Sequence, residues 1–178
     1  MEKAYKFRIY PTEAQVALIQ RTFGCCRFVY NHFLARRQKA YAESQETLGF
    51  AACCRELTKL KQDLAWLTEV DATALQSALR ALENAFQGFF RRVKKGEKPG
   101  YPKFKSKKHH RKSYTAKNNG NTVAFDGYSI RLPKLGLVKA GGYTAIKGRI
   151  VNATVSQSAS GKYFVSLCCT DVEIPKHE

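Results

Sequence analysis

Cations and flat rings are concentrated in one stretch of the chain, from Phe89 to Lys117, with the sequence FFRRVKKGEKPGYPKFKSKKHHRKSYTAK. Twelve of its residues are Lys or Arg, Glu97 is its only acid, and rings such as Tyr101 and Phe104 are spaced among the cations. Lys and Arg displace counterions from phosphates, and rings or guanidinium planes stack on bases. This mixture predicts binding to a nucleic acid. The alternative for a run of charges is a solvated basic loop.

The composition of the whole chain favours the same partner. Its 178 residues include 31 Lys and Arg against 14 Asp and Glu, which gives a net charge of +17, and 44% are hydrophobic. Such a chain can build a core, and its charge repels itself unless it meets an anion. Nucleic acid is the first candidate and an anionic membrane surface the second. No apolar run approaches the ~20 residues of a membrane span, and no signal peptide is recognisable, so we expect a cytoplasmic protein.

The sequence contains no recognisable catalytic or metal-binding pattern. The six cysteines form three adjacent pairs, no CxxC occurs, and we expect small, buried, reduced thiols. Phosphate-binding glycine loops and HExxH are also missing, and the histidines have no partner pattern for nucleophilic or metal chemistry. These observations favour a binding module. The residues concerned are the pairs Cys25–Cys26, Cys53–Cys54 and Cys168–Cys169, and His32, His109, His110 and His177.

The N-terminal part predicts one strand followed by helices. Residues 3–10 alternate apolar and polar, with Lys6 and Arg8 on the polar face. Thr12 and Gln15 form a capping-box pattern that opens a helix to about Ala42, with Gly24 as a break point. We expect this helix to bury Leu18, Ile19, Phe23, Val29, Tyr30, Phe33 and Leu34, and to leave Arg27, Asn31, Arg36, Arg37 and Lys39 available to solvent or a ligand.

Two further helical patterns follow. The first covers about residues 50–61 and leads to Trp66, which we expect to anchor the core. Asp71 caps the second, whose stripe of Leu75, Leu79, Leu82, Phe86, Phe89 and Val93 predicts a core face. The neighbouring face can donate to phosphates and base edges, or be an ordinary hydrated helix face. Its members are Gln76, Arg80, Gln87 and Arg91.

The C-terminal part predicts strands. Pro99, Gly100 and Pro102 exclude a helix in the basic stretch, and a turn follows at 118–121. The predicted fold class is α+β, with a small antiparallel β-barrel (wedge-like or OB-like) interrupted by a helical insertion. Its domains are the first strand (1–11), the helical domain with its basic tail (12–117) and the rest of the barrel (118–178). The later strands are expected at 122–126, 128–132, 135–139, 143–147, 149–157 and 162–173.

Five blocks of the sequence resemble one family. They are RFVYNHFLARR (27–37), ALQSALRALENAFQGFFRRVKKG (74–96), KPGYPKFKSK (98–107), LPKLGLVK (132–139) and ATVSQSASGKYFVSLCC (153–169). The family is TnpB, also called OrfB, which IS200/IS605-type transposons encode. Its members are RNA-guided DNA endonucleases related to Cas12. The resemblance covers essentially the whole chain in order.

The resemblance implies a wedge β-barrel split by a helical recognition domain. In this family the two domains hold a guide RNA, the ωRNA or reRNA, and read a transposon-adjacent motif on double-stranded target DNA; base pairing supplies the remaining specificity. The family's RuvC nuclease domain, with Mg²⁺ and a zinc-binding insert, would follow Glu178. We therefore expect no catalytic residue, metal or cofactor in this chain alone, no DNA cleavage by it, and the RuvC-containing remainder as a further partner. The family is prokaryotic, cytoplasmic and nucleoid-associated when bound to DNA.

The resemblance also implies site residues. Gln76 is the strongest candidate for reading the DNA motif, because an amide can bind adenine bidentately. Ala72 departs from the longer polar residue expected there, which leaves the motif's sequence open. The DNA-motif candidates are Phe50, Ala72, Thr73, Gln76, Ser77, Thr115, Asn118 and Asn119. The RNA or phosphate candidates are Lys6, Arg8, Arg27, Arg36, Arg37, Arg80, Arg91, Arg92, Lys94, Tyr101, Lys103, Phe104, Lys105, Lys107 and Lys108.

Two alternatives remain open at the level of sequence. A stand-alone DNA-binding transcriptional regulator derived from a transposase would bind a specific duplex without RNA. A structural RNA-binding protein would bind RNA without preference for a DNA motif.

Overall fold

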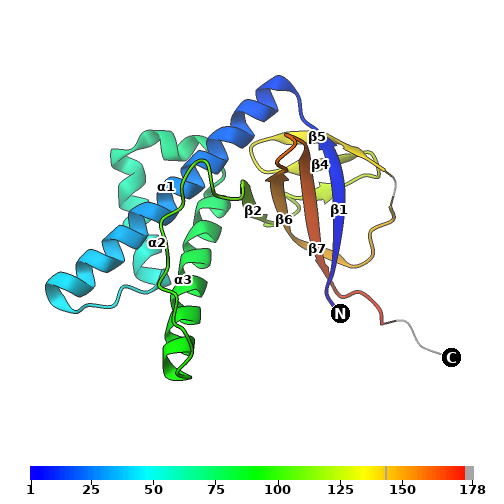
Figure 1. The fold of residues 1–178 in the computed structure, drawn as a ribbon. Helices are drawn as coiled ribbons and strands as arrows, with labels where there is room; N and C mark the ends of the chain where they lie inside the picture. The colour runs from blue at the N-terminus through cyan, green and yellow to red at the C-terminus, as the bar shows by residue number, and fades with distance from the viewer. Residues whose placement is uncertain (143, 175–178) are drawn as a thin grey trace. The chain divides into compact units, whose positions relative to one another are not determined.

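The computed structural model describes residues 1–142 and 144–174, and they form two compact units. One unit combines Met1–Phe23 with the chain from Arg111 onward, and the other is Gly24–His110 (Figure 1). The first is therefore discontinuous in sequence. The domain limits expected at residues 11 and 117 stay a prediction.

The discontinuous unit is built on one antiparallel sheet. Its seven strands have the order β2-β6-β7-β1-β5-β4-β3, so the α+β class is confirmed. The sheet is open: β2 and β3 are its edges in the described residues, and the predicted closed barrel is wrong. The strands are β1 (Lys3–Tyr10), β2 (Ser113–Lys117), β3 (Ala124–Phe125), β4 (Ser129–Leu132), β5 (Gly136–Gly141), β6 (Arg149–Gln157) and β7 (Tyr163–Thr170).

Strand β1 lies inside the sheet although it comes first in the chain. It pairs with β7 along seven residues, from Lys3↔Cys169 to Ile9↔Tyr163, and with β5 at Arg8↔Gly141 to Tyr10↔Lys139. Its alternation is confirmed, because Tyr5, Phe7 and Ile9 are buried. Since the partners of β1 follow the helices in sequence, the helical region interrupts the sheet.

Helix α1 (Glu13–Ser44) begins at the predicted capping box. The backbone N–H of Thr12 donates to Gln15 Oε1 at 2.9 Å, and the backbone N–H of Gln15 donates to Thr12 Oγ1 at 3.3 Å. The Gln15 amide also donates to the carbonyl of Leu137 at 2.8 Å, which ties the helix start to β5. The helix continues through Gly24, so the expected break is not present.

The second unit contains the remaining helices: α2 (Phe50–Asp63), a 3-10 helix η1 (Ala65–Glu69) and α3 (Ala72–Lys94). The Asp71 side chain caps α3 by accepting from the backbone N–H of Thr73, as predicted. The stripe of α3 is buried from Leu75 to Phe86, whereas Val93 at its end is 51% exposed. Trp66 is 42% exposed and packs edge-on against Phe28, so its prediction as a core anchor is wrong.

Two strand predictions are also wrong. Residues 113–117 were expected in the basic tail, yet they form β2, paired with β6 from Ser113↔Ser156 to Lys117↔Asn152. Alternation of buried Tyr114 and Ala116 with less buried neighbours was the signal, and it was obscured by the surrounding cations. The strand expected at 143–147 is absent over 144–147, and residue 143 lies outside the described residues.

Gly148, which precedes β6, provides a test of the sheet's packing. Its φ is +85°, and a Cβ there would overlap the carbonyl oxygen of Thr170 and lie 2.9 Å from Val172 Cγ2. Gly161 has a similar φ of +83° but open space around it. We expect Gly161→Ala to lower the free energy of unfolding by about 1 kcal/mol, from backbone strain alone, and Gly148→Ala to lower it by about 2–4 kcal/mol, because overlap is added.

Urea denaturation of both variants measures this difference. Equal losses in the two variants would contradict the close packing of Gly148 against β7.

Candidate nucleic-acid interface

The basic segment, defined here as residues 98–110, is fixed to the helical unit through its backbone (Figure 1). The amide of Asn31, on α1, donates to the carbonyl of Lys105 at 2.8 Å and accepts from the backbone N–H of Lys105 at 2.8 Å. Arg92, on α3, donates to the carbonyls of Pro99 at 2.7 Å and Gly100 at 3.2 Å. These bonds order an irregular segment without using most of its cations.

Lys105 and His110 are half-buried, unlike the other charged or titratable side chains of the basic segment. The Lys105 ammonium lies 4.1 Å from the centroid of the Tyr30 ring, and burial lowers its pKa from the ordinary value. Burial also lowers the pKa of His110, with smaller contributions from the cations Lys105 and Arg27. His110 is therefore mostly neutral at pH 7, and the charge of the segment comes from its five lysines.

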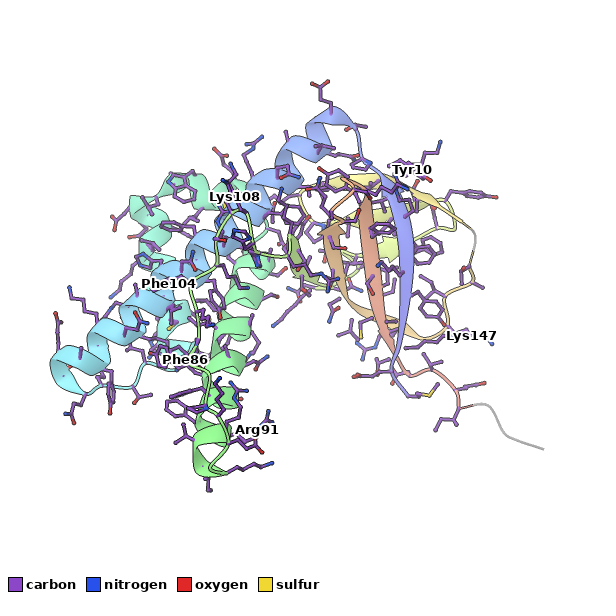
Figure 2. All side chains as sticks on the ribbon, in the orientation of Figure 1. Tyr10, Phe86, Arg91, Phe104, Lys108 and Lys147 are labelled. Carbon is purple, nitrogen blue, oxygen red and sulfur yellow. The ribbon has the colours of Figure 1, made fainter. Side chains whose placement is uncertain are left out.

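Apart from buried Pro102, the other side chains of the basic segment are exposed. Lys103, Lys107 and Lys108 are exposed, and the ring of Phe104 is 55% exposed. Figure 2 shows Phe104 and Lys108 extending from the segment. Tyr101 differs, because its ring packs edge-on against Phe86 and Phe89 while 43% of it remains exposed. The structure thus presents cations and one free ring side by side.

The polar face of α3 is exposed as predicted. Gln76, Arg80, Gln87 and Arg91 are all exposed, and they recur at steps of four or seven residues along the helix. Asn84 is exposed on the same face, and the sequence-based prediction did not include it among the residues of this face. Its position four residues after Arg80 was the available signal. The face therefore holds three amides and two guanidiniums in a row.

The DNA-motif candidates fall into two groups, one in each unit. In the helical unit, the Arg80 guanidinium lies 3.6 Å from the centroid of the Phe50 ring, which brings the start of α2 next to the polar face of α3. Ala72 and Gln76 are exposed near the start of α3, and Ser77 is half-buried. The Thr73 hydroxyl is hydrogen-bonded to Asp71 within the helix cap. The first group thus converges around Gln76.

The second group lies at the edge of the sheet. Thr115, on β2, shares a 2.9 Å hydrogen bond between its hydroxyl and that of Thr154. The Asn118 side chain donates to the carbonyl of Ile150 and accepts from the backbone N–H of Val123, so it holds a turn. Asn119 is exposed. Thr115 and Asn119 are therefore better placed than Asn118 to meet a ligand.

Two arginines of α1 are used within the helical unit. Arg37 is only 7% exposed. Its guanidinium lies 2.8 Å from a Glu83 carboxylate oxygen and 3.9 Å from the centroid of the Phe86 ring. Contrary to the prediction, Arg37 is not available to solvent, because a buried, paired charge cannot leave its partner without a large cost. Its contact with RNA stays a prediction. Arg36 forms two 3.1 Å hydrogen bonds to Glu56 and remains partly exposed.

A second basic surface lies on the outer face of the sheet. Lys6 Nζ is 4.7 Å, and the Arg8 guanidinium 5.8 Å, from the centroid of the Phe164 ring. Arg8 also lies 5.1 Å from the ring of Tyr10, and its buried Nε has no hydrogen-bond partner among residues 1–142 and 144–174. Phe164 was missed, because sequence alone did not place β7 beside β1. This surface offers two cations around a ring, and each unit thus carries its own candidate contact with nucleic acid.

Over residues 1–142 and 144–174, no three His, Cys, Asp or Glu side chains gather to hold a metal ion. The same residues contain no helix of the length and apolarity needed to cross a membrane. Burial raises the pKa of the Cys26 thiol to about 12, which makes it unreactive at neutral pH.

Comparison with known proteins places the chain among transposon proteins. A helix-turn-helix domain family of OrfB proteins of IS605-type transposons matches residues 1–46. A protein of Streptomyces pristinaespiralis named "Putative RNA-guided DNA endonuclease" is 34% identical over 184 residues, which cover 98% of this chain and 43% of that protein. Its counterpart InsQ of Escherichia coli strain K12 is 29% identical over 178 residues, covering 98% and 42%. The virulence protein VsdF of Salmonella dublin is 33% identical over 116 residues, covering 60% and 95%.

The similarity covers only part of the longer relatives. The chain spans less than half the length of the first two relatives. The residues matched by the helix-turn-helix family hold one strand, β1, and one long helix, α1. The next helix, α2, begins at Phe50, beyond that match. Residues 1–46 therefore do not contain the pair of helices that the family's description names.

Replacing Asn31 tests whether it holds the basic segment. Asn31→Leu keeps the size of the side chain but removes both hydrogen bonds to Lys105. Each bond contributes about 1 kcal/mol, so we expect trypsin to cleave after Lys103 or Lys107 about tenfold faster. Gln38→Leu, on the same helix and without a bond to this segment, is the control. Equal cleavage in both variants would show that other contacts order the segment.

The pKa of His110 gives a second test of this geometry. We expect a histidine NMR titration to give a value below the ordinary 6.5, and Lys105→Gln to move it back upward because one repelling cation is removed. As pH falls through 6.5, the unfolded chain binds the proton first, so His110 lowers the free energy of unfolding until its folded pKa is passed. An unchanged pKa in Lys105→Gln would contradict the coupling.

Proposed function

The chain belongs to the OrfB (TnpB) family of IS605-type transposon proteins, and on this premise we propose that it binds nucleic acid as part of an RNA-guided DNA endonuclease. Its ligands are a guide RNA and the transposon-adjacent motif of a double-stranded target. The proposal assigns binding, not cleavage, to these residues. Two relatives support it, because each is named "Putative RNA-guided DNA endonuclease".

One observation carries the proposal: the basic segment is held by its backbone while its cations remain exposed. Asn31 and Arg92 bond carbonyl and N–H groups of the segment, and Lys103, Lys107 and Lys108 extend from it. An ordered row of ammonium groups binds phosphates with less loss of conformational entropy than a flexible loop. With a net charge of +17, this arrangement favours a phosphate backbone as the ligand.

The polar face of α3 supports reading of DNA. Helices enter the major groove and read base edges through amides and guanidiniums. Gln76 is exposed and lies one turn before Arg80, whose guanidinium rests on Phe50. We assign Gln76 to a base edge and Arg80 to a neighbouring phosphate or guanine.

A stand-alone DNA-binding regulator is the second candidate, and the helix-turn-helix family match favours it. The single helix within residues 1–46 argues against it, because that motif needs a second helix in the groove. Protein purified with its transposon end separates the two candidates. A single discrete RNA in the purified protein supports the guide-binding proposal, whereas its absence combined with tight binding to one duplex supports the regulator.

The salt dependence of RNA binding tests the basic segment. Lys107→Gln with Lys108→Gln removes two exposed cations, and we expect the slope of log K against log salt to fall by about 1.4 for single-stranded RNA. Arg55→Gln with Lys59→Gln makes the same charge change on exposed positions of α2 and is the matched control. A slope unchanged by the first pair, or equally reduced by both pairs, would argue against contacts at this segment.

Gln76→Ala tests the DNA contact. We expect discrimination among target motifs to fall by about 1–3 kcal/mol at one base pair, with affinity for non-specific duplex unchanged. Competition binding with every base at each motif position measures the effect. Gln62→Ala, an exposed glutamine of α2, is the control. A uniform loss of affinity for all sequences would reassign Gln76 to a phosphate.

A further inference from the structure

An aromatic pocket of about 320 Å³ opens in the helical unit, and none of the functions above uses it. Phe86, Phe89 and Phe90 of α3 line it together with Tyr101 of the basic segment. The rings of Phe86 and Phe90 are nearly parallel, 28° apart, with centroids 6.3 Å apart, and Tyr101 stands edge-on to Phe89 at 5.1 Å. Figure 2 shows Phe86 on α3, followed by Arg91 toward the helix end.

Two of these rings are unusually exposed for a packed site. Phe90 is 51% and Tyr101 43% exposed, so the pocket leaves apolar ring surface in contact with water. The exposed cations Arg91, Lys94 and Lys103 are close in sequence to these rings. An apolar floor with cations nearby suits a ligand that has a flat apolar face and an attached negative charge.

Two polar side chains complete the lining. Arg37 is held between Glu83 and Phe86, and its fixed guanidinium reaches the pocket wall. Glu46, which follows the end of α1, is exposed and also lines the pocket. A carboxylate accepts hydrogen bonds from exocyclic amino groups such as that of cytosine. The pocket can therefore hold a flat ring and accept from its edge.

We propose that this pocket binds one unstacked nucleobase of a single strand, with preference for bases that carry an amino group. The inference rests on the proposed binding of nucleic acid and adds a site to it. Stacking on aromatic side chains is how proteins hold unpaired bases, and the phosphates on either side of the base would meet the neighbouring cations. A purely apolar partner, such as a protein helix, would make no use of those cations or of Glu46.

The test uses the whole chain, a 12-nucleotide oligo(A) RNA and an oligo(U) RNA of equal length. Phe90→Leu removes an exposed ring but keeps an apolar side chain, and Phe90→Tyr restores the ring. We expect Phe90→Leu to weaken oligo(A) binding about five- to tenfold and Phe90→Tyr to bind like the native chain. Tyr128→Leu removes a ring that is 75% exposed and lies outside the pocket, and it is expected to change binding less than twofold.

Ultraviolet cross-linking and base preference give independent readouts. Bases stacked on rings cross-link to them, so peptides with Phe90 or Tyr101 should carry the RNA adduct. Glu46→Leu should narrow the preference for oligo(A) over oligo(U), because the side-chain acceptor is lost. If native protein binds RNA but Phe90→Leu binds equally and no adduct forms at these rings, the pocket proposal fails alone. If native protein binds neither RNA, the pocket proposal fails, and the guide-RNA proposal is decided separately by the RNA found in the purified protein.

Discussion

The central position of β1 is the constraint on which the sheet unit depends. This strand comes first in the chain, yet β7 and β5 bond to its two edges. Both partner strands follow β1 by more than a hundred positions, as in Ile9↔Tyr163 and Ile9↔Ala140. The sheet cannot close its hydrogen bonds until the chain has returned from the helical unit. The capping box at Thr12 and Gln15 fixes where the chain leaves, and the Gln15 amide donates to the carbonyl of Leu137 in β5.

The net charge of +17 divides into two kinds of cation. Some hold the fold: Arg37 is buried against Glu83 and Phe86, and Arg92 bonds the turn at Pro99 and Gly100. Others, such as Lys107 and Lys108, are exposed on a segment whose backbone is already fixed. Because the first kind is satisfied internally, only the second can exchange its hydration for phosphate. The net charge alone would therefore overestimate the number of cations that can contact phosphate.

The two surfaces proposed to meet nucleic acid use different chemistry. The basic segment offers point charges, which position a backbone without reading sequence. The polar face of α3 offers amides and guanidiniums from Gln76 to Arg91, groups that distinguish base edges. The aromatic pocket adds stacking, which favours an unpaired base over a duplex. Binding of a folded RNA and reading of a duplex, as proposed above, would draw on these three kinds of interaction.

Local patterns in the sequence determined the elements whose causes are local. Alternation predicted β1, capping residues predicted the starts of α1 and α3, and spacing predicted the exposed face from Gln76 to Arg91. Tertiary structure alone decided what depends on distant partners. Arg37 became buried because Glu83 faces it from another helix, Trp66 remained exposed, and Phe164 met Lys6 because β7 lies beside β1. The sheet is also open, whereas the sequence predicted a barrel. Strand spacing predicts that strands form, but it does not predict whether the two edge strands pair with each other.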